Sequence, residues 1–152
     1  MNLSTQDARA LLGTVRVARL GTVDEHGQPH LVPVTFAVDG DHLYIAIDHK
    51  PKTTTNLKRL RNIGHNPRVS LLADHYEEDW SQLWWVRVDG QASILSGADR
   101  AGPLDLLAGK YRQYEERRPD GPLISIEVTQ WTAWASSLHA TTLLRASDGR
   151  DR

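Results

Sequence analysis

The sequence predicts a mainly β protein, in which six antiparallel strands close or nearly close into a barrel with helices at its ends. Apolar residues alternate with polar ones in several segments that are separated by turn residues, the pattern of half-buried strands. Helical spacing of apolar residues is confined to three short segments. Six strands hide their edges best by closure. The expected order is helix, three strands, helix, two strands, helix and strand.

The first part of the chain predicts a helix followed by a three-stranded meander. Ser4 or Thr5 is a suitable helix cap, and Gly13 is a suitable end. The three strands are predicted at residues 15–23, 30–38 and 43–47. A slip in the alternation of the first strand indicates a bulge. The pair Asp39-Gly40 predicts the hairpin between the second and third strands.

The pattern changes in the middle of the chain. Lys50-Pro51-Lys52 disfavours a central strand, because proline has no backbone N–H to donate. Thr53 to Thr55 offer caps for a helix that ends at Asn66, since the residue before Pro67 disfavours helical geometry. The remaining elements are predicted as strands at 68–73 and 83–95, a helix at 103–114 and a last strand at 123–134.

Length and composition predict one globular domain. The 152 residues contain 39% hydrophobic and 24% charged residues and show no internal repeat, so residues 1–146 form the expected domain and 147–152 a polar tail. No apolar run approaches the ~20 residues that span a bilayer. The polar N-terminus is unlike a secretory signal, and the absence of cysteine suits a reducing compartment. We therefore expect a cytoplasmic protein without a membrane partner.

The segment around Lys50 and Lys52 is a candidate phosphate site. Two lysines beside the threonine hydroxyls of a helix start are a suitable set of donors for a phosphate. The alternative is a solvated basic loop with threonine caps. The net charge of −1 and the absence of an aromatic single-strand signature argue against nucleic acid as a partner.

Trp84 and Trp85 are a second unusual feature, because adjacent strand residues point to opposite faces. One tryptophan is expected in the core and the other outside, against a partner subunit or a flat ligand. A core position plus a dimer interface is the simpler alternative. Hydrolytic and metal chemistry find little support, since there is no Gly-x-Ser-x-Gly sequence and the histidines are scattered.

The order of several short motifs resembles a known family. The motifs are Gly21-Thr22-Val23, the run from Gly27 to Phe36, Lys50-Pro51-Lys52, the run from Asn66 to Leu72 and the run from Val86 to Ala92. Together they make the region from Val17 to Leu95 similar to pyridoxamine-phosphate-oxidase-like proteins, in particular to the branch of deazaflavin (coenzyme F420)-dependent oxidoreductases.

The resemblance implies a six-stranded split β-barrel of the FMN-binding type that works as a homodimer, with the cofactor in a groove between the two barrels. Lys52 takes the place of the family's phosphate-binding lysine, and the neighbouring residues assist it. The cofactor-binding residues that the resemblance implies are His30, Leu31, Val32, Pro33, Val34, Thr35, Ile45, Ala46, Lys50, Lys52, Thr53, Thr54, Trp84 and Trp85.

Two departures separate the chain from pyridoxamine phosphate oxidases proper. Those enzymes have an Arg-Gln pair where this chain has Trp84-Trp85, and they end in an Arg-Leu-His-Asp-Arg segment that residues 131–140 lack. Vitamin B6 oxidation is therefore disfavoured. We expect hydride transfer from F420 to a small unsaturated molecule, with an FMN-dependent enzyme or a non-catalytic flavin or haem binder as alternatives. No catalytic residue or metal site is predicted.

Overall fold

The computed structural model describes residues 1–47 and 57–137 of the chain. Its helices are α1 Thr5–Thr14, α2 Lys58–His65, α3 Ala101–Lys110 and α4 Arg112–Glu116. Its strands are β1 Ala18–Val23, β2 Pro29–Val34, β3 Phe36–Asp39, β4 His42–Ile45, β5 Arg68–His75, β6 Trp84–Leu95 and β7 Leu123–Ala135. Short 3-10 turns lie at Trp80–Gln82 and Gly97–Arg100. No helix in these two ranges is long and apolar enough to cross a bilayer.

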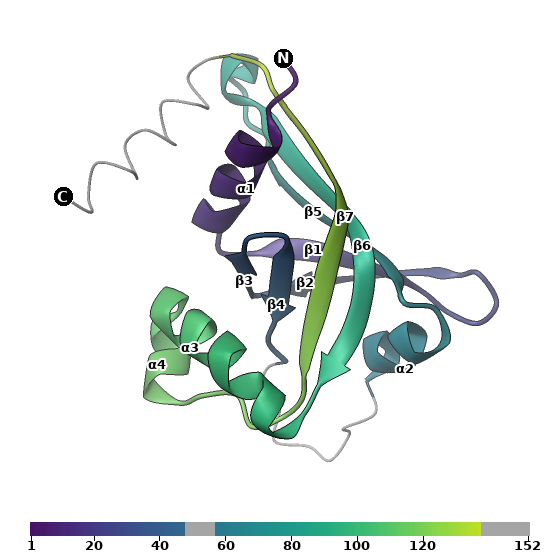
Figure 1. Ribbon diagram of the computed structural model, residues 1–152. Coiled ribbons are helices and arrows are strands. Elements are labelled where there is room, and N and C mark those ends of the chain that lie inside the picture. Colours follow the sequence, from purple (N-terminus) through teal and green to yellow (C-terminus); the bar gives the residue numbers. More distant parts are fainter. Residues whose placement is uncertain (48–56, 138–152) are drawn as a thin grey trace.

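The strands of the described ranges form one antiparallel sheet in the order β2-β1-β5-β6-β7-β4-β3. The two end strands are consecutive in sequence, and only Thr35 separates them. The sheet therefore curls until its edges approach each other (Figure 1). The predicted mainly β split barrel is confirmed. The strand number differs, because the strand predicted at 30–38 changes pairing partner at Thr35 and forms two strands.

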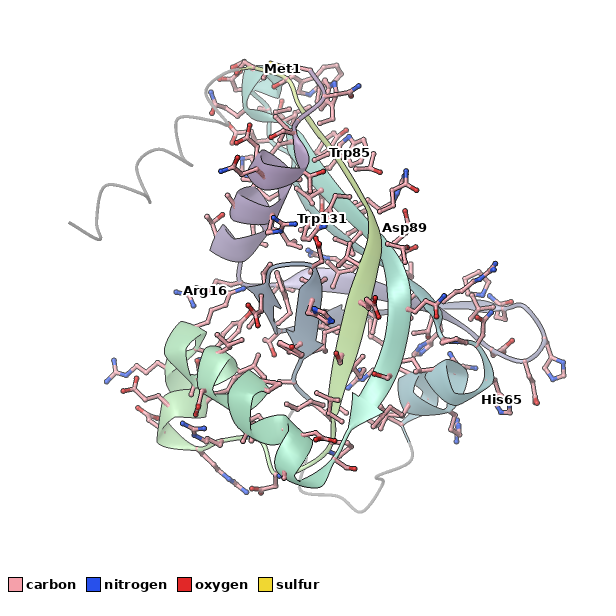
Figure 2. The ribbon with its side chains drawn as sticks, in the orientation of Figure 1. Met1, Arg16, His65, Trp85, Asp89 and Trp131 are labelled. Atoms are coloured by element: carbon pink, nitrogen blue, oxygen red, sulfur yellow. The ribbon has the colours of Figure 1, made fainter. Side chains whose placement is uncertain are left out.

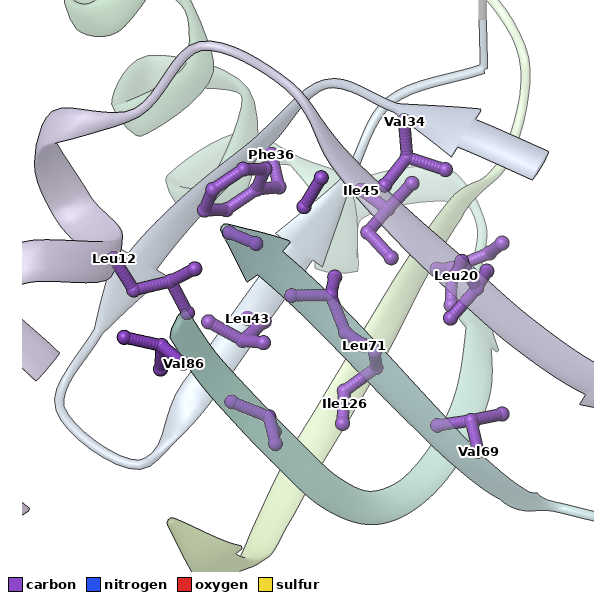
Figure 3. Close-up of a cluster of buried hydrophobic side chains, with 14 of the residues drawn as sticks. Leu12, Leu20, Val34, Phe36, Leu43, Ile45, Val69, Leu71, Val86 and Ile126 are labelled. Atoms are coloured by element: carbon purple, nitrogen blue, oxygen red, sulfur yellow. The ribbon is translucent and has the colours of Figure 1, made fainter. Parts of the chain in front are cut away.

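The core lies inside the curl. Phe36, Leu20, Leu43 and Ile126 are fully buried there, and α1 adds Leu12 (Figure 3). Such close packing supplies most of the free energy that favours folding, at roughly 1.5–3 kcal/mol for each large apolar side chain. A second cluster lies under α3 and α4 and contains Ala37, Ala46, Leu107, Tyr111, Tyr114 and Leu123.

Local sequence signals explain most element boundaries. Ser4 caps α1, because its hydroxyl accepts a hydrogen bond from the Asp7 N–H at 3.1 Å. The hairpin turns use Gly27 and Gly40 at φ values of 81° and 58°, a region that glycine adopts without steric cost. The strand predicted at 15–23 begins only at Ala18.

Two predicted helices differ from the structure. The helix predicted at 103–114 is divided into α3 and α4, because Tyr111 has extended backbone geometry. Helix α2 begins at Lys58, and its N-cap residue is Leu57, whose side chain makes no capping bond. A threonine therefore does not occupy the N-cap position. Thr53 to Thr55 lie outside the described residues.

Candidate functional site

Strand β2 carries most of the residues that the sequence assigns to cofactor binding. It pairs with β1 on one side only, from Ala18↔Val34 to Val23↔Pro29, and forms one edge of the sheet. Even-numbered residues of β2 face inward, with Val34 buried and His30 half-buried. Odd-numbered residues face outward, and Leu31 is 72% exposed. The strand thus offers side chains to the interior and a free backbone edge to the outside.

The direction of the backbone groups of β2 follows from its pairing. The Asp24 N–H donates to the Gln28 carbonyl at 3.1 Å, which makes this a hydrogen-bonded pair at the turn. Because hydrogen-bonded and non-bonded pairs alternate in an antiparallel ladder, the backbone groups of residues 29, 31 and 33 point away from β1. Residues 29 and 33 are prolines, which have no N–H. Leu31 therefore provides the outward-pointing N–H of this strand.

His30 contains a buried polar atom without a protein partner. Its Nδ1 is inaccessible to solvent and forms no hydrogen bond within the described residues. An unpaired buried nitrogen costs about 1–3 kcal/mol, so such atoms in folded proteins usually have a role or a ligand. The protein itself covers this atom, so the groups of β2 that a planar heteroaromatic ligand can reach are the N–H and carbonyl of Leu31 on the free edge. The residues of β2 therefore fit a flavin-type cofactor.

The structure also brings the end of β4 to this strand. The Ala46 N–H donates to the Thr35 carbonyl at 3.3 Å, and Ile45 pairs with Phe36. The residues predicted at 30–35 and at 45–46 thus form one continuous region. Lys50, Lys52, Thr53 and Thr54 lie outside the described residues, so their predicted role in phosphate binding stays a prediction.

The two tryptophans are separated as expected, with one in the core and one outside. Trp84 is 6% exposed, packs in the core and stacks on His75 at 6.3 Å between ring centres. It shares one core cluster with Val34, Phe36 and Ile45. The structure thus places Trp84 in the core cluster that also holds residues of β2 and β4, and its contact with a cofactor stays a prediction.

Trp85 lies on the outer face of the sheet (Figure 2). It lines a groove of about 500 Å³ together with Leu31, Leu72 and Tyr76, whose exposed fractions are 72%, 40% and 66%. Trp85 and Leu31 thus share one surface, although their strands are far apart in the sequence. This apolar outer face is defined by these four residues.

Sequence reasoning missed a polar cluster that joins Thr35 and Phe36 to the end of α3 and the start of α4. Lys110 Nζ donates to the Phe36 carbonyl at 2.9 Å. The Phe36 N–H donates to the Tyr111 hydroxyl at 3.0 Å, and the Tyr114 and Thr35 hydroxyls are 2.7 Å apart. Spacing indicated only a buried helix face at Tyr111. The partner of these side chains is a strand 75 residues away, which local patterns do not reveal.

Comparison with known proteins gives the family. The model of the family described as pyridoxamine 5'-phosphate oxidase matches residues 4–135. The chain belongs to this family. The match includes all the described strands, so the resemblance inferred from the short motifs is confirmed.

One relative and two solved structures add detail. A 5a,11a-dehydrotetracycline/5a,11a-dehydrooxytetracycline reductase of Streptomyces rimosus is 34% identical over 70 residues, which are 46% of this chain and 48% of that relative. The match thus spans about half the length of that reductase. The structure of a FAD-binding protein of Mesorhizobium loti has a TM-score of 0.66 and 23% identity, and the match covers 88% of this chain and 95% of that chain.

A conserved hypothetical protein of Mycobacterium tuberculosis has a TM-score of 0.72 and 18% identity, with 88% of this chain and 86% of that chain covered. These two structural likenesses show that the fold is shared.

Proposed function

We propose that this protein is an oxidoreductase that binds a flavin-type cofactor along β2 and the end of β4. The observation that carries the proposal is the free backbone edge of β2, where the Leu31 N–H points away from β1. Membership of the pyridoxamine 5'-phosphate oxidase family supports the proposal. The partial match to a reductase favours reduction of an organic substrate.

The residues of this region have separate tasks in the proposal. The Leu31 N–H and carbonyl bind polar atoms at the rim of the cofactor ring. Ala46 holds the end of β4 against Thr35 through its backbone bond of 3.3 Å. When bound, a reduced flavin or deazaflavin supplies a hydride to the substrate, and the protein binds, orients and excludes water.

We expect the cofactor to be the deazaflavin F420 rather than FMN. Pyridoxamine phosphate oxidases place a glutamine where this chain has Trp85, whose outward-facing ring replaces the glutamine amide. Fluorescence titration of the full chain should therefore show tighter binding of the deazaflavin. The visible spectrum and mass spectrometry of any ligand released from the purified protein provide a second readout. Tighter FMN binding would point to an FMN-dependent enzyme, and haem alone would point to a non-catalytic binder.

We also propose a homodimer that buries the apolar outer face formed by Leu31, Leu72, Tyr76 and Trp85. Three of these side chains are more than a third exposed in the single chain, which is unfavourable for so much clustered apolar area. A second copy would bury this face and cover the free edge beside Leu31. The contact area expected for an obligate pair is above roughly 2,000 Å².

Sedimentation at micromolar concentration should give about twice the chain mass of 17.1 kDa. Trp85→Asp should shift the protein toward monomer, because it places a charge in the apolar outer face. Trp80→Asp is the matched control, since Trp80 is 74% exposed but lies outside the groove. A parent protein that binds cofactor as a stable monomer would refute the dimer.

A further inference from the structure

A groove of about 610 Å³ lies between the segment before β1, the β2–β3 junction and helix α4. Arg16 and Val17 line one wall, Thr35 lines the base, and Lys110 and Tyr114 are among the residues on the opposite wall. Arg16 reaches across to this wall, where its guanidinium donates to the Lys110 carbonyl (Figure 2). Thr35 belongs both to this groove and to the proposed cofactor region.

Two cations in this groove have no acidic partner. Within residues 1–47 and 57–137, neither Arg16 nor Lys110 forms an ion pair with an Asp or Glu side chain. Other arginines of the chain do: Arg9 pairs with Asp41, and Arg118 with Asp105. At the rim, Arg112 pairs with Glu116 on its own helix at 3.5 Å.

The position of Lys110 makes the missing partner significant. Its ammonium group is half-buried, 3.8 Å from the centre of the Phe36 ring, and held by the Phe36 carbonyl. Burial of a charge without a counterion is costly, and a second cation nearby adds to the cost. An anion in the groove would offset both effects.

We propose that this groove binds the ionised oxygen of an organic acid with an apolar body, such as an enolate, a phenolate or a carboxylate. The apolar body is inferred from Val17, whose side chain is 42% exposed, and from the tyrosines that line the groove. Because Thr35 joins the groove to the cofactor region, the anion is the substrate of the reductase. The identity as substrate rests on the proposed function, whereas anion binding rests on the groove alone.

The charge of Lys110 gives the groove a defined dependence on pH. Burial, and then the charge of Arg16, lower the pKa of Lys110 to about 8. The other groups that face it are the Arg16 guanidinium and Tyr111, whose pKa is raised by burial, together with the Tyr114 hydroxyl. Lys110 is therefore the group that loses charge between pH 7 and pH 9. Anion binding favours the protonated amine, so affinity should fall as the pH rises above about 8.

The test uses dimedone, a cyclic diketone that is an enolate at neutral pH, and cyclohexanone as its neutral counterpart. Binding to the full chain is followed by amide chemical shifts in NMR, with and without saturating cofactor. At pH 7, Lys110→Met should weaken dimedone binding by about tenfold, the loss expected for one charge-assisted contact. Cyclohexanone should bind equally to both proteins. Lys58→Met is the control, since Lys58 is ion-paired with Asp24 on another part of the molecule.

Lys110→Arg keeps the positive charge, so it should bind dimedone like the parent at pH 7 and should not lose affinity above pH 8. If Lys110→Met fails to fold, the pH dependence of dimedone affinity in Lys110→Arg tests the role of this charge instead. Dimedone affinity that is insensitive to Lys110→Met in a folded protein would overturn the proposal, as would displacement of dimedone by the cofactor. Cofactor titration of the same samples tests the proposed function separately. A protein that binds dimedone through Lys110 but no cofactor would refute the reductase and keep the anion site.

Discussion

Gly90→Ala should lower the free energy of unfolding by about 3 kcal/mol, the upper part of the usual range for overpacking. Gly90 lies opposite a bulge in β7, because Asp89 pairs with Gln130 and Gly90 with Val128, which leaves Thr129 as the extra residue. A Cβ atom there would lie 2.5 Å from the Glu127 carbonyl oxygen and 2.8 Å from a methyl group of Ile126. The nearest of these atoms belongs to the backbone, so relief requires a shift of the paired strands. Urea unfolding at equilibrium measures the effect.

Gly13→Ala is the matched control and should have the opposite sign. Gly13 lies in the last turn of α1, and an added Cβ would meet nothing within 4 Å. Alanine at a helical position stabilises by up to about 1 kcal/mol relative to glycine. A Gly90→Ala protein that is as stable as the parent would contradict the close approach of β7 to Gly90.

Lys52→Ala should weaken cofactor binding by about ten- to a hundredfold, because a charge-assisted bond to phosphate contributes on the order of 1.5–3 kcal/mol. Lys50→Ala should cost less, since the resemblance to the family implies Lys52 as the main phosphate ligand. Neither change should much alter the Tm of the ligand-free protein. Fluorescence titration with the deazaflavin measures the affinity.

Lys58→Ala serves as the control for that series. Lys58 is the first residue of α2, and its ammonium lies 3.7 Å from a carboxylate oxygen of Asp24 on the protein surface. A surface ion pair of this kind contributes little to stability, so its loss should leave both folding and cofactor binding nearly unchanged. Parent-like cofactor affinity in Lys52→Ala would mean that the basic segment is a solvated loop.

Most of the fold could be predicted from the sequence, because its signals are local. Alternation marked β5 and β6, and the cap at Ser4 marked α1. The division of one predicted strand at Thr35 could not be predicted, since it depends on which distant strand each half pairs with. The break at Tyr111 has a similar origin, because its hydroxyl is held by Phe36 and by the Arg16 carbonyl.

The site was only partly accessible to sequence reasoning. The motif around β2 identified the residues that the structure joins to Ala46, since that motif is continuous in the chain. Alternation placed Trp84 on one face with Val86 and Val88, and the structure shows that this face is the buried one. Arg16 and Lys110 were missed because what distinguishes them is that no carboxylate among the described residues pairs with them. The neighbours of a side chain are visible only in the tertiary structure.

The most direct test of the central claim is an NMR titration of the isotope-labelled full chain with the deazaflavin and, separately, with FMN. If a flavin-type cofactor binds along β2, the amide signals of His30, Leu31 and Ala46 should shift saturably at micromolar ligand, with Leu31 among the largest changes. Amides on the solvent face of α1 should stay in place. Saturable shifts that leave His30, Leu31 and Ala46 unchanged, or no shifts with either ligand, would contradict the account.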